Sequence, residues 1–394
     1  MGEFLHLGTR AAELRPLGGP LRGSTRTTEQ SHDETNSQET PRTPRAAAEC
    51  CELALRAPVG LRPVAAVSAT GGPLAEYRGR RVLLLGAPGF IGRWVGRRLC
   101  EAGADVTLVV RDPAIAAPVL AAYSVRGSVI RANLTDDRDV RRVVDAARPW
   151  ITFNLAGYGV DPLERDESTA YALNRDLVDH LCRALRSQGA HGRLVHVGSA
   201  LEYGRARGDL HEDTPALPDT LYGTSKLAGT TVLAAARASG YVRGLTARLF
   251  MVYGPGEHPR RLLPTLLRAG QHTDRIALTE GLQERDFAYV DDVAEGLLRL
   301  GLVADTAPPV VNLARGRMTR VADFVLTAAR IAGIGEERLG FGDLPGRDEE
   351  MAHEPVNVGR LRDLTGGWSP GRDETAGIRA TLDFSHRSGQ GSIA

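Results

Sequence analysis

The sequence has almost no lysine. Its 394 residues include 49 lysine and arginine side chains, and Lys226 is the only lysine among them. A chain whose composition has moved this far toward arginine should keep lysine only where a compact, rotatable ammonium does something that a planar, permanently charged guanidinium cannot do. Lys226 is therefore the first candidate for a functional residue.

Other features are scarce too, and each absence excludes a class of protein. The formal net charge is only +1, which gives no electrostatic reason to expect binding to nucleic acid or to an anionic membrane. No apolar run approaches about 18 residues and none follows the N-terminus, so we expect a cytoplasmic protein without membrane span or secretory signal. The four cysteines lack Cys-x-x-Cys spacing, so we expect reduced thiols and no metal site; they are Cys50, Cys51, Cys100 and Cys182.

The first 76 residues differ in composition from the rest. Residues 23–45 are rich in Ser, Thr, Glu, Gln and Arg and have almost no apolar side chains, so they cannot bury enough surface to offset the entropy of ordering. We expect residues 1–76 to be a disordered extension, which could reflect a start codon placed too far upstream. A transit peptide is the alternative, but acidic residues between Glu29 and Glu39 disfavour it.

From residue 80 onward, short β-branched runs alternate with helical patterns. The expected strands are residues 81–85, 105–110, 128–131, 151–155, 193–197 and 244–249. Continuous apolar strands separated by amphipathic helices indicate βαβ units and a parallel sheet buried on both faces. We therefore predict an α/β protein of the Rossmann type, with a doubly wound parallel sheet. Its expected parts are an NAD(P)-binding domain over 77–249, a smaller and interleaved substrate-binding domain over 250–382, and a flexible tail over 383–394.

A glycine-rich turn follows the first strand and opens the first helix. Gly86, Gly89 and Gly92 are spaced Gly-x-x-Gly-x-x-Gly. The first glycine allows a tight turn, the second lets the backbone approach a pyrophosphate, and the third permits close packing of helix on strand. Between a strand and a helix, this spacing predicts a dinucleotide site.

The end of the second strand bears on the choice of dinucleotide. Arg111 lies 19 residues after Gly92, where an acidic side chain would bind the ribose 2′-hydroxyl of NAD and an arginine would accommodate the 2′-phosphate of NADP. Val110 takes the acidic position and Arg111 follows it, which favours NADP(H). A one-residue slip would instead give the ribose to Asp112, so NAD(H) stays open.

Lys226 follows Tyr222 by four residues in a segment with helical character. Residues at i and i+4 share a helix face at about 5 to 6 Å, so phenol and ammonium should point the same way. An ammonium beside a phenol favours the phenolate, which would bring the tyrosine pKa from about 10 toward neutrality. Tyr222 is therefore a candidate general acid/base.

With these motifs, residues 80–375 resemble the extended short-chain dehydrogenase/reductase family, the nucleotide-sugar epimerases, dehydratases and ketoreductases. Further motifs follow in that family's order. Residues 133–136 read Asn-Leu-Thr-Asp, residues 154–157 Asn-Leu-Ala-Gly, residues 197–204 Val-Gly-Ser-Ala-Leu-Glu-Tyr-Gly, residues 211–215 His-Glu-Asp-Thr-Pro, residues 248–255 Arg-Leu-Phe-Met-Val-Tyr-Gly-Pro, residues 285–292 Arg-Asp-Phe-Ala-Tyr-Val-Asp-Asp and residues 367–370 Gly-Trp-Ser-Pro.

The resemblance implies roles for individual residues. Ser199 would complete a catalytic set with Tyr222 and Lys226, by bonding the substrate oxygen that Tyr222 protonates, while Lys226 would hold the nicotinamide ribose. The implied substrate contacts are Ser199, Ala200, Arg285 and Arg347. The implied cofactor contacts are Gly86, Gly89, Phe90, Ile91, Gly92, Arg111, Asn133, Leu134, Ala156, Gly157, Tyr222 and Lys226.

Departures from the family pattern narrow the activity. Ala200 and Leu201 stand where sugar dehydratases usually carry acidic residues, which disfavours elimination of water, and Glu202 before Tyr203-Gly204 resembles the ketoreductase branch. Met251 replaces an asparagine that often contacts substrate. We expect NADPH-dependent reduction of a keto group, at C4, on a nucleotide-diphosphate deoxysugar. An epimerase with tightly bound NAD and a non-catalytic dinucleotide sensor are the alternatives.

The resemblance also implies a homodimer. Residues 166–187 and 222–238 would pair across a two-fold axis into a four-helix bundle. Both segments carry apolar stripes that could form such an interface. The stripe residues are Leu173, Leu177, Leu181, Leu185 and Leu227.

Overall fold

A computed structural model describes residues 72–161, 163–189, 192–206, 208–346 and 355–387. The predictions for residues 1–71, for Cys50 and Cys51 and for Arg347 lie outside the described residues. In the part of the chain that the structure describes, no helix is both long enough and apolar enough to cross a membrane.

The centre of the fold is a seven-stranded parallel sheet with the order β10-β6-β5-β4-β1-β2-β3. Its strands are β1 (Arg81–Leu85), β2 (Asp105–Val110), β3 (Ser128–Arg131), β4 (Ile151–Asn154), β5 (Arg193–Ser199), β6 (Arg243–Leu249) and β10 (Val310–Leu313). Three of the six predicted strands have the predicted bounds, and the others differ by one or two residues at one end. The predicted doubly wound α/β fold is confirmed, and β10 shows that the chain returns to this sheet after residue 250.

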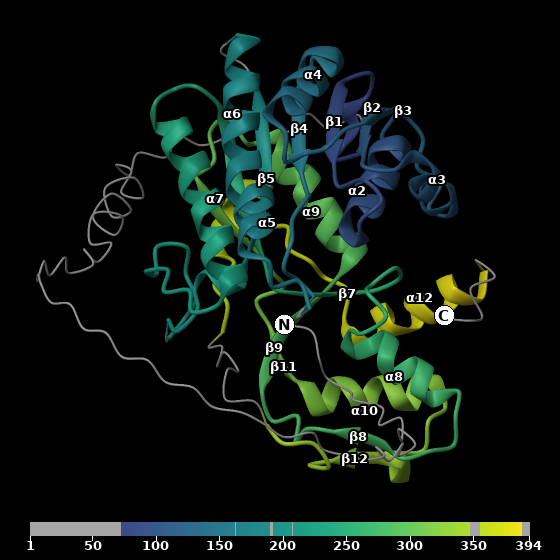
Figure 1. The fold of residues 1–394 in the computed structure, drawn as a ribbon. Helices are drawn as coiled ribbons and strands as arrows, with labels where there is room; N and C mark the ends of the chain where they lie inside the picture. Colours follow the sequence, from purple (N-terminus) through teal and green to yellow (C-terminus); the bar gives the residue numbers. More distant parts are fainter. Residues whose placement is uncertain (1–71, 162, 190–191, 207, 347–354, 388–394) are drawn as a thin grey trace, which may run out of the picture.

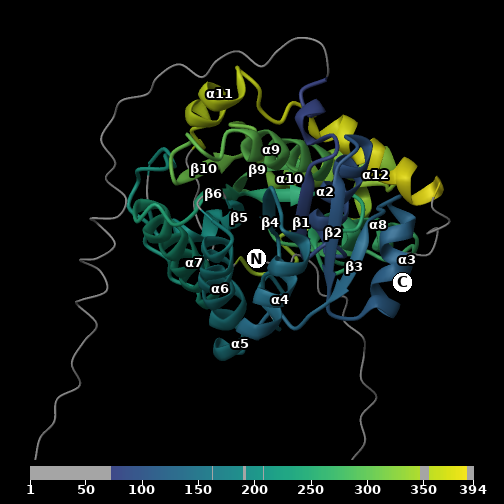
Figure 2. The ribbon, with the colours of Figure 1, turned by 90° about the horizontal axis from the view of Figure 1, so that it is seen from above.

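Helices cover both faces of the sheet (Figure 2). One face carries α2 (Phe90–Glu101), α3 (Pro113–Ala122) and α9 (Val290–Leu302). The other carries α4 (Asp137–Ala147), α6 (Leu177–Ser187) and α7 (Leu221–Ala238). Because both faces are covered, the strands are apolar along their whole length, as in β1 where four of five residues are buried.

The helix predicted over 166–187 is interrupted. The structure has α5 (Glu167–Tyr171), a π-helical turn η2 (Ala172–Asp176) and then α6. Within the π-turn Asn174 is fully buried, and its side-chain amide donates to the Tyr158 carbonyl at 2.8 Å and the Ser225 hydroxyl at 2.9 Å. Such turns are frequent at functional sites, and this one anchors a loop beside α7.

Most of the leucine stripe proposed for a dimer interface is buried inside the protomer. Leu177, Leu181 and Leu185 are at most 1 % exposed and belong to the core between helices and sheet, so they cannot meet a second subunit. Only Leu173 and Leu227 are partly exposed. The homodimer stays a prediction, and this part of its support is wrong.

A smaller lobe lies below the sheet (Figure 1). It contains a mixed sheet of β7 (Met251–Tyr253), β9 (Glu284–Tyr289) and β11 (Met318–Arg320), and a parallel pair of β8 (Ile276–Leu278) and β12 (Leu339–Phe341). Its helices are α8 (Leu262–Gly270), α10 (Val321–Ala332) and α12 (Glu374–Arg387). It has its own core, in which the rings of Phe287 and Phe324 stack at 4.1 Å.

Short elements complete the described chain and shift two predicted boundaries. They are η1 (Ala75–Tyr77), η3 (Ala200–Glu202), η4 (Glu336–Arg338) and α11 (Gly359–Thr365). Order begins before residue 77, because Tyr77 in η1 is fully buried and donates its hydroxyl to the Leu298 carbonyl at 2.6 Å. The tail predicted from residue 383 is helical as far as Arg387, because Phe384 packs on the ring of Tyr123 at 4.8 Å.

Candidate active site

The candidate residues gather at the carboxyl ends of the central strands. β1 runs into the turn at Gly86, β2 into Arg111, β4 into Ala156 and Gly157, and β5 ends at Ser199. In an open parallel sheet this edge is where ligands bind, since loops from neighbouring strands meet there. α7 adds Tyr222 and Lys226 from its first two turns.

The glycine turn has the backbone geometry that a pyrophosphate needs. Gly86 has φ +74°, and a Cβ there would lie 2.8 Å from the Ala156 amide nitrogen. A Cβ at Gly92 would lie 2.0 Å from the Gly86 carbonyl oxygen, so a side chain is excluded there too. Gly89 caps α2, whose first residues are Phe90 and Ile91. The positive end of this helix faces the turn, so the residues present fit a dinucleotide.

Arg111 and Asp112, the two residues after β2, make different contacts. Asp112 is the N-cap of α3, and its carboxylate accepts the backbone amides of Ala114 at 2.9 Å and Ile115 at 3.4 Å. Arg111 is exposed, and no hydrogen bond or ion pair to it occurs among the described residues. The cap uses Oδ1 of Asp112, so the one-residue slip would require a carboxylate that already serves the start of α3.

The loop after β3 is closed by its own side chains. The Asn133 side-chain oxygen accepts from the Thr135 hydroxyl at 2.9 Å, while its backbone amide donates to Asp139 at 2.7 Å. Leu134 is partly buried against the core under α4 and α6. This loop lies after the strand next to β2, at the same edge of the sheet as the glycine turn.

Tyr222 and Ser199 are brought together. Tyr222 is partly buried at the start of α7, and its side chain lies near the hydroxyl of Ser199, a residue that is 7 % exposed. Burial raises the pKa of Tyr222 above its ordinary value, and the negative charge of Glu202 raises it further, while the nearby Ser199 hydroxyl opposes the shift. The expectation that this pKa falls toward neutrality is therefore wrong: burial outweighs the nearby cations. A phenol with a raised pKa holds its proton at neutral pH and can act as an acid.

Lys226 is also close to this pair. It is 3 % exposed, and its Nζ lies 5.9 Å from the centre of the Tyr222 ring and donates to the Val197 carbonyl at 3.0 Å. Burial lowers its pKa to about 8, partly opposed by the charge of Glu202. Most Lys226 side chains are thus still charged at pH 7.

Gly157 and its neighbours lie opposite α7 in the candidate site. A Cβ at Gly157 would lie 2.9 Å from Lys226 Nζ and 3.1 Å from the Asn174 side-chain oxygen. Ala156, partly buried, donates its amide to Asn154 at 3.2 Å. Sequence reasoning missed Asn174; its signal was an asparagine inside an otherwise apolar helical stripe.

Not all of the predicted substrate contacts lie beside Ser199, Tyr222 and Lys226. Ala200 is 1 % exposed and packs into the core. Arg285 is 4 % exposed in β9 of the smaller lobe, where its Nη1 donates to the Glu284 carbonyl at 2.7 Å. Their contact with substrate, like that of Arg347, stays a prediction.

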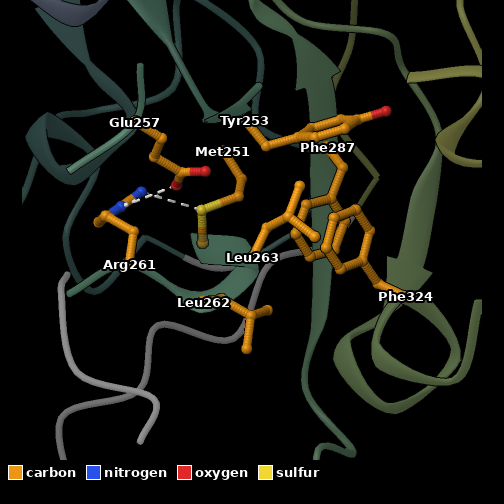
Figure 3. A pocket seen from close by; sticks show the side chains of 8 residues that line it. All are labelled: Met251, Tyr253, Glu257, Arg261, Leu262, Leu263, Phe287 and Phe324. Carbon is orange, nitrogen blue, oxygen red and sulfur yellow. Dashed lines mark hydrogen bonds and ion pairs between the residues drawn. The ribbon is translucent and has the colours of Figure 1, made fainter. Parts of the chain in front are cut away.

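A narrow pocket opens in the smaller lobe. Figure 3 shows Arg261 pointing toward Glu257 and the Met251 sulfur, with Phe287 and Phe324 forming the far wall. Arg261 Nε lies 3.3 Å from Glu257 Oε1, and its Nη2 lies 3.2 Å from Met251 Sδ. Arg261 is near enough to Tyr222 for its charge to lower that pKa. Met251, which departs from the family pattern, thus contacts Arg261, whose charge acts on Tyr222.

A Rossmann-type sheet with a glycine turn and a joined serine, tyrosine and lysine defines a dinucleotide-dependent enzyme of the short-chain dehydrogenase/reductase class. Residues 82–314 match the model of the NAD dependent epimerase/dehydratase family. The chain belongs to this family, which confirms the resemblance drawn from the motifs.

Known relatives come from nucleotide-sugar metabolism. The chain is 30% identical over 310 residues, 76% of its length and 93% of the relative, to dTDP-6-deoxy-L-talose 4-dehydrogenase (NAD(P)(+)) of Kitasatospora kifunensis. It is 28% identical over 308 residues, 74% and 90% of the two chains, to dTDP-4-dehydro-6-deoxy-D-allose reductase of Streptomyces bikiniensis. MoeE5, solved in complex with UDP-glucose and NAD, superposes with a TM-score of 0.66 at 27% identity over 78% of this chain and 99% of its own.

Proposed function

We propose that this enzyme reduces the C4 keto group of a nucleotide-diphosphate deoxysugar with NADPH. The observation that carries the proposal is the placement of Tyr222 near Ser199 and beside the buried Lys226, whose Nζ lies 5.9 Å from the centre of the Tyr222 ring. The two dTDP-sugar relatives support it, since one is named a 4-dehydrogenase and the other a reductase of a 4-dehydro sugar.

Each member of the set has a distinct task. Bound nicotinamide cofactor supplies the hydride. Tyr222 donates its phenolic proton to the carbonyl oxygen, which its raised pKa allows because the proton is retained until that oxygen becomes basic. The Ser199 hydroxyl donates a hydrogen bond to the same oxygen and polarises the carbonyl. Lys226 would hold the ribose hydroxyls through its ammonium, and Gly86, Gly89 and Gly92 leave room for the pyrophosphate.

Preference for NADPH over NADH is part of the proposal. Arg111 is exposed at the end of β2 and Asp112 is engaged in capping α3. The Arg111 guanidinium, which makes no hydrogen bond or ion pair among the described residues, can donate two charge-assisted hydrogen bonds to a 2′-phosphate, whereas the Asp112 carboxylate already accepts two backbone amides of α3.

The second candidate is an epimerase that retains NAD. It is favoured by the family match and by the likeness to MoeE5 in complex with UDP-glucose and NAD. The two candidates differ in net redox change: a reductase consumes NADPH stoichiometrically, and an epimerase leaves the cofactor unchanged.

The test uses the purified full chain, a dTDP-4-keto-6-deoxy sugar and either NADPH or NADH, with the loss of reduced-cofactor absorbance as readout. We expect turnover with NADPH and almost none with Tyr222→Phe. Cofactor released from the denatured enzyme is measured in parallel. Tightly bound NAD together with isomerised sugar and no consumption of NADPH would contradict the reductase and favour the epimerase.

A further inference from the structure

Glu202 is a buried carboxylate under the catalytic set that the proposed chemistry does not use. It is 0 % exposed and ends the short turn η3 after β5. Its Oε1 accepts the backbone amide of Ser199 at 2.8 Å. Its Oε2 accepts Arg248 Nε at 2.8 Å and the Thr230 hydroxyl at 3.0 Å. One carboxylate therefore joins the ends of β5 and β6 to the middle of α7.

The partner of Glu202 is itself buried. Arg248 is 1 % exposed, and its guanidinium lies 4.4 Å from the centre of the Tyr203 ring. Tyr203 donates its hydroxyl to Asn312 in β10 at 2.8 Å. Replacing a buried ion pair with apolar side chains is often neutral or stabilising, so stability alone does not explain why charge is kept here.

The backbone makes room for this carboxylate at one position. A Cβ at Gly198 would lie 2.4 Å from Glu202 Oε1 and 2.6 Å from Thr246 Cγ2. Only glycine lets the Glu202 side chain fold back onto the strand from which it departs. The glycine before Ser199 is thus explained by Glu202.

Two side chains of opposite charge hold the end of β5. Lys226 donates to the Val197 carbonyl at 3.0 Å, and Glu202 accepts from the Ser199 amide two residues later. The Ser199 hydroxyl, which lies near Tyr222, is carried by this same strand end. Freedom of this strand end would move the hydroxyl that has to meet the substrate oxygen.

We propose that Glu202 is a positioning residue of the active site, which fixes the backbone of Ser199 and places a negative charge beneath Tyr222 and Lys226. Its effect on turnover rests on the proposed function, whereas its effect on Lys226 does not.

The charged groups around Glu202 determine in which direction the pKa values of its neighbours should change when its charge is removed. Arg248 faces it from β6, Lys226 and Tyr222 face it from α7, and Tyr203 follows it in the chain. Burial lowers the pKa of Lys226, and the charge of Glu202 raises it. Removing that charge must therefore lower the pKa of Lys226 further. It must also lower the pKa of Tyr222, since Glu202 raises that pKa as well.

The single lysine makes this shift directly measurable. Protein expressed with lysine labelled with ¹³C at Cε gives a single lysine NMR signal, because Lys226 is the only lysine. The chemical shift of this signal can be followed during a pH titration. We expect a midpoint of about 8 in the wild type. Glu202→Gln should lower it by about one pH unit. An unchanged midpoint would overturn the electrostatic role, whatever the enzyme turns over.

Glu212→Gln is the matched control. The Glu212 side chain is also 0 % exposed and accepts a backbone amide, that of Asn312, at 2.9 Å. It lies outside the catalytic set, so the substitution should lower the Tm but leave the Lys226 midpoint in place. An equal shift in both variants would show a general effect of buried charge and would contradict the proposal.

Kinetics test the positioning of Ser199. With NADPH and the keto sugar, Glu202→Gln should lower kcat by about 10-fold to 10²-fold, with the KM for NADPH within about twofold, because a small misplacement acts on the chemical step. The basic limb of the kcat profile should move to lower pH with the Lys226 midpoint. Glu212→Gln should keep kcat within about twofold of wild type. If Glu202→Gln lowers the Tm but leaves kcat unchanged, Glu202 has a structural role only.

A milder variant covers failure of Glu202→Gln to fold. Thr230→Val removes one hydrogen bond to Glu202 Oε2 but keeps the carboxylate and Arg248. We expect kcat to fall about fivefold, the equivalent of one hydrogen bond. Wild-type kcat in Thr230→Val, with the Tm lowered, would count against the positioning role. If the wild type reduces no keto sugar, the proposed function fails, and the lysine titration still decides the role of Glu202.

Discussion

Two of the buried glutamate–arginine pairs in the described part of the chain are built differently. In the Rossmann domain, the two oxygens of Glu202 accept three hydrogen bonds, and Arg248 beside it is almost fully enclosed. In the smaller lobe, Glu257 meets Arg261 at 3.3 Å, and Oε2 of Glu257 has no hydrogen-bond partner among the described residues. We call Glu202 and Arg248 the scaffold pair, whose carboxylate is bonded through both oxygens, and Glu257 and Arg261 the pocket pair, whose carboxylate has one oxygen without a partner.

The difference has an electrostatic consequence. Burial raises the pKa of Glu257 to about 7, although Arg261 opposes the shift, so this carboxyl can take up a proton near neutral pH. Arg261 also reaches Tyr222 with its charge. The scaffold pair should thus set the geometry of the reaction, and the pocket pair should adjust how substrate is held. Each prediction below tests one side of this division.

The largest effect is expected at the tyrosine that the scaffold pair supports. Tyr222→Phe keeps the ring packing and removes only the proton donor, so kcat should fall by about 10² to 10⁴. Cofactor affinity, measured by fluorescence titration, should barely change because the ribose contact is assigned to Lys226. A kcat within about tenfold of wild type would remove Tyr222 from the role of acid.

Lys226→Arg tests whether the single lysine is needed for its shape or only for its charge. Arginine keeps the positive charge, but its planar fork cannot occupy the space of an ammonium that lies 2.9 Å from the Cβ position of Gly157. We expect kcat/KM for the cofactor to fall at least about 10²-fold. Turnover within about a factor of two would mean that charge suffices and that the scarcity of lysine carried no information.

The two arginines themselves should differ in stability. Arg248→Met leaves a fully buried carboxylate without its cation and should lower the free energy of unfolding by about 3 to 5 kcal/mol. Arg261→Met should cost less than about 2 kcal/mol at pH 6, because Glu257, with a pKa of about 7, is already mostly protonated at that pH and does not become an unpaired charge. Urea denaturation of both variants at pH 6 measures this, and equal losses would erase the distinction.

Much of this organisation was readable in the sequence, because it depends on local patterns. Apolar runs gave the strands of the sheet, and glycine spacing gave the turn at Gly86, where φ +74° and close backbone contacts require it. Lys226 and Tyr222 lie four residues apart, so one helix was enough to join them. The family order of motifs added Ser199.

What depends on long-range packing was not readable. The predicted pKa of Tyr222 moved the wrong way, because proximity to a cation is visible in sequence and the degree of burial is not. Asn174 acts through a π-turn that has no sequence period of its own, and Glu202 owes its place to Arg248, which lies 46 residues away in the chain. The leucine stripe was read as an interface because its periodicity does not say which surface covers it.

Cofactor choice depends on neither pair and should survive changes to both. Arg111→Ala should remove most of a preference for NADPH over NADH that we expect to be about one to two decades in kcat/KM, or about 1.5 to 3 kcal/mol. Activity with NADH should be spared, because Arg111 meets only the 2′-phosphate. Equal use of both cofactors by the wild type would end this assignment.

The smallest effect is the pH dependence of stability that Glu257 contributes. Its folded pKa, about 7, lies above the ordinary value of 4.5. The folded state therefore binds more protons than the unfolded state between these values, and stability must fall as the pH rises through this window. From about pH 5.5 to 7 the contribution amounts to ~1.5 kcal/mol. Glu257→Gln cannot titrate, so its free energy of unfolding should lack this decline, and the difference between wild type and variant, taken from urea denaturation at each pH, isolates it. A difference that does not change between pH 5.5 and 7 would show that Glu257 stays charged, and the pocket pair would then be as fixed as the pair at Glu202.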